Sequence, residues 1–150
     1  MLIYIEELFN PIQSNRLVRP VTKCHSGYMP PQIHVHKKFH SGLADVMEDI
    51  AKTGFWPTTL VSKPSPPPHL HWHRMEAHGY VMEGTTWILD GETKQKLIVE
   101  PGDKLVIPPG ALHIEGEGEG DVTYVVAIPT TQTLIEAFEL IPADHPDRPL

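Results

Sequence analysis

The stretch PGDKLVIPPGALHIE, residues 101–115, contains the pattern on which the fold prediction rests. A short apolar run at 104–107 lies between two turns rich in Gly and Pro, and a second short segment follows at 113–115. Such runs are typical of β-strands joined by tight turns. Outward from this stretch, similar runs recur about every 8–12 residues, which favours an all-β sandwich or barrel. We expect strands at 58–61, 69–73, 77–82, 85–89, 96–99, 104–107, 113–115 and 122–128.

Helical spacing is found on either side of this region. Apolar residues recur every three or four positions after Ser41, a good N-cap, and Gly54 can end the helix, so we predict a helix at about 42–53. A second short helix is expected within 132–141, followed by a loose tail rich in Pro and Asp.

These patterns predict three parts: an N-terminal extension (1–54), a barrel (55–130) and a C-terminal helix with its tail (131–150). Leu2, Tyr4 and Leu8 could form an edge strand in the extension. Cys24 is expected to be a packing residue, because a single cysteine cannot form an internal disulfide and no site motif surrounds it.

Three histidines alternate in the segment 68–73, at positions 69, 71 and 73. Alternate side chains of a strand share one face, so these imidazoles are expected to point the same way. His113, forty residues further on, could join them if the two segments meet. Converging neutral imidazoles are ligands for Zn, Fe, Ni or Cu, and an added carboxylate favours Fe, Mn or Ni. The pattern predicts a metal site, with Trp72 packing on the opposite side of its strand.

A similar alternation at His34 and His36, with His40 nearby, is interpreted differently. These histidines could form a second metal site, but we expect exposed side chains or a subunit contact instead.

The net charge of −7, with histidines neutral, disfavours nucleic acid and anionic membranes as partners. The first residues have no basic region of the kind that begins a signal peptide, and no apolar run approaches the length of a membrane span. A cytoplasmic location is therefore expected.

Residues 66–116 resemble the two signature motifs of the cupin superfamily, in particular its small single-domain (cupin_2-like) members. The second motif runs from Gly102 through Pro108 and Gly110 to His113, while the position of its final Asn holds Glu117. The first motif is similar from His71 and His73 to the segment Tyr80–Gly84. The resemblance implies an all-β double-stranded β-helix, or jelly-roll, barrel with the helix at 42–53 in an N-terminal extension. It also implies a homodimer.

The chain departs from the first motif at one place. The family's metal-binding Glu would fall at position 77, which is Ala77, with Glu76 before it and His78 after it. Because neighbours on a strand face opposite sides, the site could be three histidines with an open position, or a bulge near Gly79 could turn Glu76 inward.

Several ligand sets therefore remain open. We favour His71, His73 and His113 with Glu76 as fourth ligand. In a further variant, His69 and His71 bind the metal with Glu76, and His73 lies behind them.

The resemblance implies a divalent transition metal (Fe, Zn, Ni or Mn) and a small-molecule ligand. The favoured function is a small metalloenzyme of the oxygenase or isomerase type acting on a polar or carbonyl-bearing molecule, with Glu76 or His78 as acid or base. The alternative is a non-catalytic module that binds or senses a metal or small ligand.

Overall fold

The computed structural model of the protein describes residues 29–116, 120–129 and 133–149. The expected edge strand at Leu2, Tyr4 and Leu8 lies outside these residues, as do Cys24 and Glu117.

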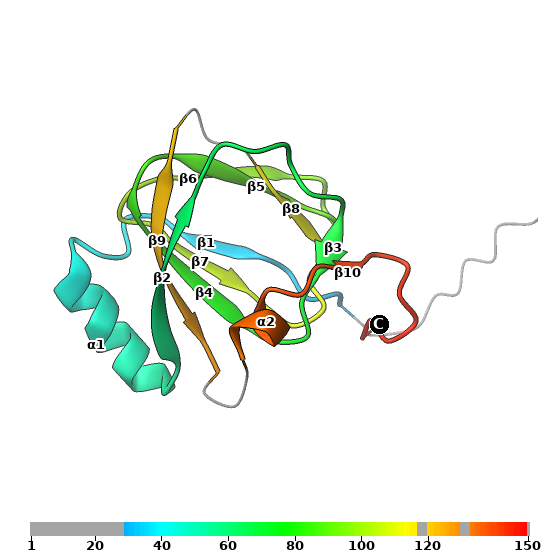
Figure 1. Cartoon of the computed structure of the whole chain (residues 1–150), viewed down its shortest axis with the longest axis horizontal. Coiled ribbons are helices and arrows are strands. Elements are labelled where there is room, and N and C mark those ends of the chain that lie inside the picture. The colour runs from blue at the N-terminus through cyan, green and yellow to red at the C-terminus, as the bar shows by residue number, and fades with distance from the viewer. Residues whose placement is uncertain (1–28, 117–119, 130–132, 150) are drawn as a thin grey trace, which may run out of the picture.

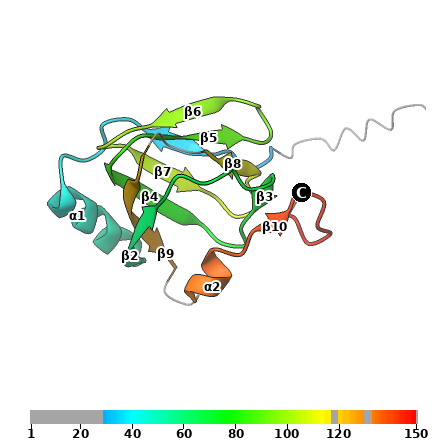
Figure 2. The same ribbon diagram turned by 45° about the horizontal axis from the view of Figure 1, so that its top comes forward.

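Two antiparallel sheets of five strands form the body of the protein (Figure 1). The order is β1-β7-β4-β9-β2 in the first sheet and β10-β3-β8-β5-β6 in the second. Their strands are β1 (His34–His36), β2 (Trp56–Ser62), β3 (His71–Trp72), β4 (Ala77–Glu83), β5 (Thr86–Asp90), β6 (Lys96–Val99), β7 (Lys104–Ile107), β8 (His113–Glu115), β9 (Val122–Ile128) and β10 (Ile141–Pro142). The turned view shows the second sheet lying over the first (Figure 2). The expected all-β jelly-roll fold is confirmed.

The predicted strands from 96 to 128 agree with the structure, and those predicted at 77–82 and 85–89 differ by one residue at their ends, whereas the two before them differ more. β2 extends over seven residues because its whole length pairs with β9. β3 is shorter than the predicted 69–73, because only His71 pairs with β8 and the segment before it is rich in proline.

Helix α1 (Leu43–Thr53) lies where the sequence predicts it and ends at Gly54, whose φ of 71° is the left-handed conformation expected there. Its start differs: Gly42 is the N-cap, and the backbone N–H and hydroxyl of Ser41 donate instead to the Asp45 carboxylate. Val46 and Ile50 of the helix are buried against Tyr80 and its neighbours on the outer face of the first sheet.

Helix α2 (Leu134–Ala137) is much shorter than the predicted 132–141. The chain leaves helical geometry after residue 137, and Ile141 pairs with Trp72 as part of β10. Tertiary pairing with the second sheet therefore overrides the helical spacing of the segment.

Both sheets include strands from outside the region predicted as the barrel. β1 pairs with β7, and β10 pairs with β3. The division at residues 54 and 130 stays a prediction, but the segments on either side complete the two sheets. None of the helices in the described part of the chain is long and apolar enough to cross a membrane.

Candidate metal centre

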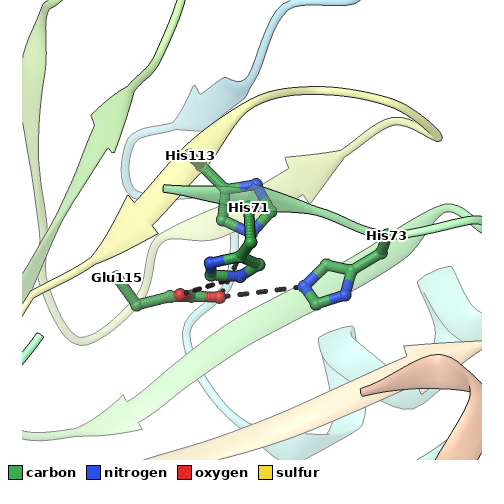
Figure 3. Close-up of side chains that lie close together, drawn as sticks. All are labelled: His71, His73, His113 and Glu115. Carbon is green, nitrogen blue, oxygen red and sulfur yellow. Dashed lines mark hydrogen bonds and ion pairs between the residues drawn. The ribbon is translucent and has the colours of Figure 1, made fainter. Parts of the chain in front are cut away.

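Three histidines meet on the inner side of the second sheet. His71 on β3 lies directly opposite His113 on β8, and His73 follows β3 immediately (Figure 3). The ring centroids are 4.4 Å apart for His71 and His113, and 5.0 Å apart for each pair that includes His73. All three residues are buried. The alternation on β3 and the register with β8 therefore bring together the three histidines that the sequence favours.

Each imidazole is held from behind by a backbone carbonyl. Nδ1 of His71 contacts the His69 carbonyl at 2.8 Å, Nδ1 of His113 contacts the Ala111 carbonyl at 2.8 Å, and Nδ1 of His73 contacts the Glu139 carbonyl at 2.9 Å. A carbonyl only accepts, so each Nδ1 carries the proton and each neutral ring presents a lone pair at Nε2. Histidine ligands of metals are commonly oriented in this way.

The carboxylate of Glu115 faces these three lone pairs. Its oxygens lie 3.1 Å from Nε2 of His113, 3.3 Å from that of His71 and 3.9 Å from that of His73. Glu115 is two residues after His113 on β8, so both side chains leave the same face of the strand. One ligand atom from each of the four residues lies within 4.8 Å of the others.

Four electron-pair donors that face one another require a cation among them. Nε2 of His71 is buried and has no hydrogen-bond partner; its 3.3 Å approach to Glu115 is an electrostatic contact without hydrogen-bond geometry. A buried polar atom without a partner is costly, and a metal ion would satisfy it. Three imidazoles and a carboxylate suit Fe, Mn, Ni or Zn, so the residues fit the expected metal.

The electrostatics of the cluster support the same conclusion. Burial would raise the pKa of the Glu115 carboxyl, but its contacts with His113, His71 and His73, when these rings carry protons toward it, hold this pKa well below its usual range. Burial lowers the pKa of His71, and the neighbouring Glu115 carboxylate more than offsets this, so that its pKa is raised. The cluster attracts positive charge to its centre, which either protons or a metal ion can supply.

Glu76, the predicted fourth ligand, does not lie with the three histidines. Its carboxylate is 2.6 Å from Nε2 of His78, and neither residue lines the cavity beside the cluster. Ala77, between them, does line it. No inward turn of Glu76 is present, because β4 continues in regular register with β7 from Ala77 onward. The ring of His69 lies 6.0 Å from that of His71, and its carbonyl orients His71.

Sequence reasoning missed Glu115, although a signal for it was present. The segment His113-Ile114-Glu115 shows the same alternation as the first histidine motif, and it directly follows a turn. The alternation was applied to His71 and His73 but not to the strand of their partner.

A cavity of about 290 Å³ adjoins the cluster, between the two sheets. His73 and Glu115 form part of its wall, and so do Tyr124 on β9 and Thr86 on β5. Burial raises the pKa of Tyr124 and the Glu115 charge adds to this, whereas the contact with Thr86 opposes it. The phenol is therefore neutral around pH 7 and can donate a hydrogen bond into the cavity.

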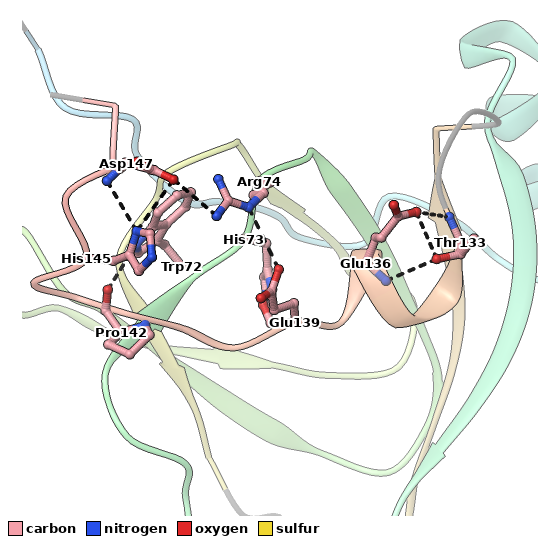
Figure 4. Close-up of polar contacts among 9 residues, drawn as sticks. All are labelled: Trp72, His73, Arg74, Thr133, Glu136, Glu139, Pro142, His145 and Asp147. Carbon is pink, nitrogen blue, oxygen red and sulfur yellow. Dashed lines mark hydrogen bonds and ion pairs between the residues drawn. The ribbon is translucent and has the colours of Figure 1, made fainter.

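The segment 133–149, here called the C-terminal strap, runs from α2 past His73 and Arg74 to Trp72 (Figure 4). Ala137 lines the cavity, the Glu139 carbonyl orients His73, and the Pro142 carbonyl accepts from Nε1 of Trp72 at 3.1 Å. Arg74 lies 3.8 Å from the Glu139 carboxylate and 3.5 Å from that of Asp147. The strap therefore forms part of both the cavity wall and the support of the metal centre.

Trp72 points away from the histidines, as predicted, and is buried against Leu112 and Ile141. His34 and His36 are exposed on β1, also as predicted. His40 differs, because it is buried with both ring nitrogens unpartnered and its ring edge-on to Tyr80. In the described ranges, His71, His73, His113 and Glu115 form the only group of three or more His, Cys, Asp or Glu side chains whose ligand atoms lie close enough to share a metal.

No protein-family model matches the chain, and no curated protein matches it. Among solved structures, a DUF861 family protein from Thermotoga maritima matches at 14% identity, covering 64% of this chain and 98% of that one, with a TM-score of 0.47. Acireductone dioxygenase from Bacillus anthracis, with a cadmium ion in its active centre, matches at 19% identity over 66% of this chain and 65% of that one, with a TM-score of 0.48.

A cupin-2 domain protein from Shewanella frigidimarina matches at 24% identity over 49% of this chain and 70% of that one, with a TM-score of 0.41. All three matches have TM-scores below 0.5 and identities below 25%. At these identities the likeness concerns the fold alone, and the activities of those proteins do not transfer to this chain.

Proposed function

We propose that the protein binds a divalent transition metal through His71, His73, His113 and Glu115, and acts as a metalloenzyme on a small molecule in the adjacent cavity. The observation that carries this proposal is the convergence of three Nε2 lone pairs and one carboxylate, each imidazole being oriented by a carbonyl behind it. Such an arrangement is costly without a cation and well suited to one.

When bound, the metal would polarise a carbonyl oxygen or permit chemistry with dioxygen, which agrees with an oxygenase or isomerase type of reaction. The residues of the chain would hold and orient the substrate. The two sheets and the C-terminal strap form the walls of the cavity, and the Tyr124 phenol in its lining would offer a proton or a hydrogen bond. We assign the acid role to Tyr124 rather than to Glu76 or His78, because the latter two do not line the cavity.

The alternative is a module that binds a metal or a small ligand without catalysis. The cavity favours the enzyme, because its lining includes both the Tyr124 phenol and Glu115, whose charge helps to raise the pKa of that phenol. A binding module would have no need of a proton donor there.

The first experiment is metal analysis of the untagged full chain after reconstitution with Fe²⁺, Mn²⁺, Ni²⁺ or Zn²⁺. We expect one equivalent for the unaltered chain. Glu115→Gln removes one anionic ligand and should weaken metal binding by at least tenfold, since an amide replaces a carboxylate. Glu76→Gln is the matched control, with the same chemical change three residues after His73, and it should leave the metal content unchanged.

A chain that takes up no metal under any of these conditions would overturn the proposal. If Glu76→Gln loses metal and Glu115→Gln keeps it, the fourth ligand would be Glu76. With the bound metal identified, oxygen consumption and product analysis across small carbonyl and phenolic compounds, comparing the unaltered chain with Tyr124→Phe, distinguish an enzyme from a binding module. No turnover by the metal-loaded protein would favour the module.

Two further properties remain proposals. We propose a homodimer, which light scattering of the full chain would test, and a cytoplasmic location, which fractionation would test. Neither is required for the site, because all four ligands come from one chain.

A further inference from the structure

The wall of the cavity opposite the metal centre is apolar except for Tyr124 on β9 and Ser62 on β2. Leu105 and Ile107 of β7 and Val122 and Val126 of β9 line the side formed by the first sheet. His73 and Glu115 lie on the side of the second sheet. A molecule in the cavity would therefore contact hydrocarbon on one side and the metal on the other.

The mouth of the cavity extends this apolar surface outward. Leu60 of β2 is 38% exposed, and Phe138 and Leu140 of the C-terminal strap are 40% and 42% exposed, while all three line the cavity. Large apolar side chains that border a cavity and remain partly exposed mark a place where an apolar ligand gains free energy by covering them.

The charge of the site limits the ligand further. Three neutral imidazoles and one carboxylate leave a divalent ion with a net charge of about +1. The other cation in the described cavity wall, Lys63, is already paired with Asp121 at 2.5 Å. A net charge beside hydrocarbon is costly unless it is neutralised. One negative charge on the ligand would neutralise it, and the Tyr124 hydroxyl can donate to that ligand.

We infer that the cavity takes a monoanionic, largely apolar molecule, with its anionic oxygen at the metal and its hydrocarbon body between β7, β9 and the C-terminal strap. The oxygen belongs to a carboxylate or to a phenol or enol that loses its proton on binding. This inference rests on the proposed function, and it specifies the small molecule as a largely apolar one with a single anionic end, instead of the polar or carbonyl-bearing molecule expected from the sequence.

The experiment is calorimetric titration of the Zn²⁺-loaded full chain with four probes. These are benzoate, 4-butylbenzoate, the neutral 4-butylbenzamide, and 4-butylphenol. A fully buried methylene strengthens binding by about fourfold. We expect 4-butylbenzoate to bind at least about tenfold more tightly than benzoate, since its chain reaches the apolar mouth, and the amide to bind at least about tenfold more weakly than its acid.

The phenol arm distinguishes the two sources of the anionic oxygen. Binding of 4-butylphenol with release of one proton, measured in buffers of different ionisation enthalpy, would assign a phenolate or enolate. Binding of 4-butylbenzoate alone would assign a carboxylate. Equal affinities for acid and amide, or no gain from the butyl group, would overturn the inference.

Two variants test whether the probe binds in the cavity. Phe138→Ala removes part of the apolar mouth of the cavity. It should weaken the binding of 4-butylbenzoate by about threefold to tenfold while leaving the affinity for benzoate nearly unchanged. Ile98→Ala is the matched control, because Ile98 is 48% exposed on β6 and does not line the cavity. Equal effects of both variants would place the probe elsewhere and overturn the inference.

Gly79→Ala tests the depth of the cavity. A Cβ there would lie 3.8 Å from the Leu105 Cβ and 3.9 Å from the Tyr124 Cδ1, so the variant should fold normally while narrowing the space. In this variant we expect a smaller ratio between the affinities for 4-butylbenzoate and benzoate, with the metal content unchanged. An unchanged advantage, with the Phe138→Ala effect also absent, would count against the inference.

The failure of this inference can be separated from that of the proposed function. Metal content is measured first on the same sample. Without metal, the proposed function fails. With one equivalent of metal and no preference for apolar anions, only the inference fails. The metal-free chain should bind none of the acids, because the Glu115 carboxylate then repels them.

Discussion

The same His-x-His pattern occurs on two strands and has different results. His34 and His36 on β1 are exposed, and their ring centroids are 6.5 Å apart. His71 and His73 are buried, with centroids 5.0 Å apart. The difference lies in the neighbouring strand, because β1 faces Val106 and Lys104 of β7, whereas β3 faces His113 of β8. A histidine pair becomes a candidate metal site through its partner in register and the carbonyls behind its rings.

The largest effect is expected from removing that partner. His113→Ala should abolish stoichiometric metal binding, because it removes the one ligand that lies opposite β3. Metal analysis after reconstitution measures this, with circular dichroism to check folding. The matched control is the double substitution His34→Ala/His36→Ala, which should retain one equivalent. A loss of metal in the control would remove the distinction between the two strands.

A second substitution tests whether the exposed pair, His34 and His36, can be turned into a metal site. Val106 lies opposite both His34 of β1 and His78 of β4, so Val106→His adds an imidazole to that face. We expect a second equivalent of Zn²⁺ to bind, at least about hundredfold more weakly than the first, because no hydrogen-bonded carbonyl orients the exposed rings. Calorimetric titration measures it, with Val106→Ala as control. Absence of any second binding event would mean that register alone is insufficient.

A substitution on the outer face of β4 should lower the stability of the fold without changing the metal content. Asp49 of α1 accepts from the Lys104 ammonium and the Tyr80 hydroxyl, each at 2.6 Å. Asp49→Asn leaves the buried ammonium without its counter-charge and should lower the free energy of unfolding by about 2–4 kcal/mol, measured by denaturant titration. Metal content should be unchanged. A variant as stable as the unaltered chain would show that the pair is not stabilising.

The same residue predicts how stability depends on pH. Burial raises the pKa of Asp49, but Lys104 and Tyr80 more than offset it, so its pKa in the folded protein lies below the ordinary value of 3.8. Its contribution to stability is complete above that value and is lost as the pH falls further, through the folded pKa. Asp49→Asn should reduce the loss of stability in this range, as followed by denaturant titration at pH 7 and at pH 3. Equal losses in both proteins would contradict this.

The smallest effect on metal binding is expected from removing the side chain that supports His73 through the C-terminal strap. Arg74, which is half-exposed, holds the strap through Glu139 and Asp147. Arg74→Ala should weaken metal binding by about tenfold or less, because Arg74 acts through the Glu139 carbonyl rather than as a ligand. Competition with a chelator measures the affinity, with Lys52→Ala, an exposed residue of α1, as control. A change of equal size in both variants would exclude a positioning role.

Much of the fold could be predicted because its strands are short, apolar and separated by Gly and Pro turns. The strands from 96 to 128 agree in their bounds with the pattern. Prediction was weaker where long-range pairing decides the outcome. α2 ends early because the chain at 139–142 pairs with the second sheet, a contact that local spacing does not contain.

The site was predictable to the extent that one strand decides it. Alternation placed His71 and His73 on one face, and the turn before His113 indicated where their partner lies. That Glu115 rather than Glu76 lies with the histidines depends on which strands adjoin and which face each presents, and this follows only from the register. The cavity likewise required both sheets and the strap.

The hydrogen bond from His73 to the Glu139 carbonyl joins residues 66 positions apart in the chain, and that from Trp72 to the Pro142 carbonyl joins residues 70 apart. During synthesis, the ligand histidines emerge well before the carbonyl that orients one of them. Contacts this distant in sequence form late in folding, because closing long loops costs entropy. High-affinity metal uptake would then report that the C-terminal strap has docked, and fragments that stop before residue 139 would bind the ion less tightly.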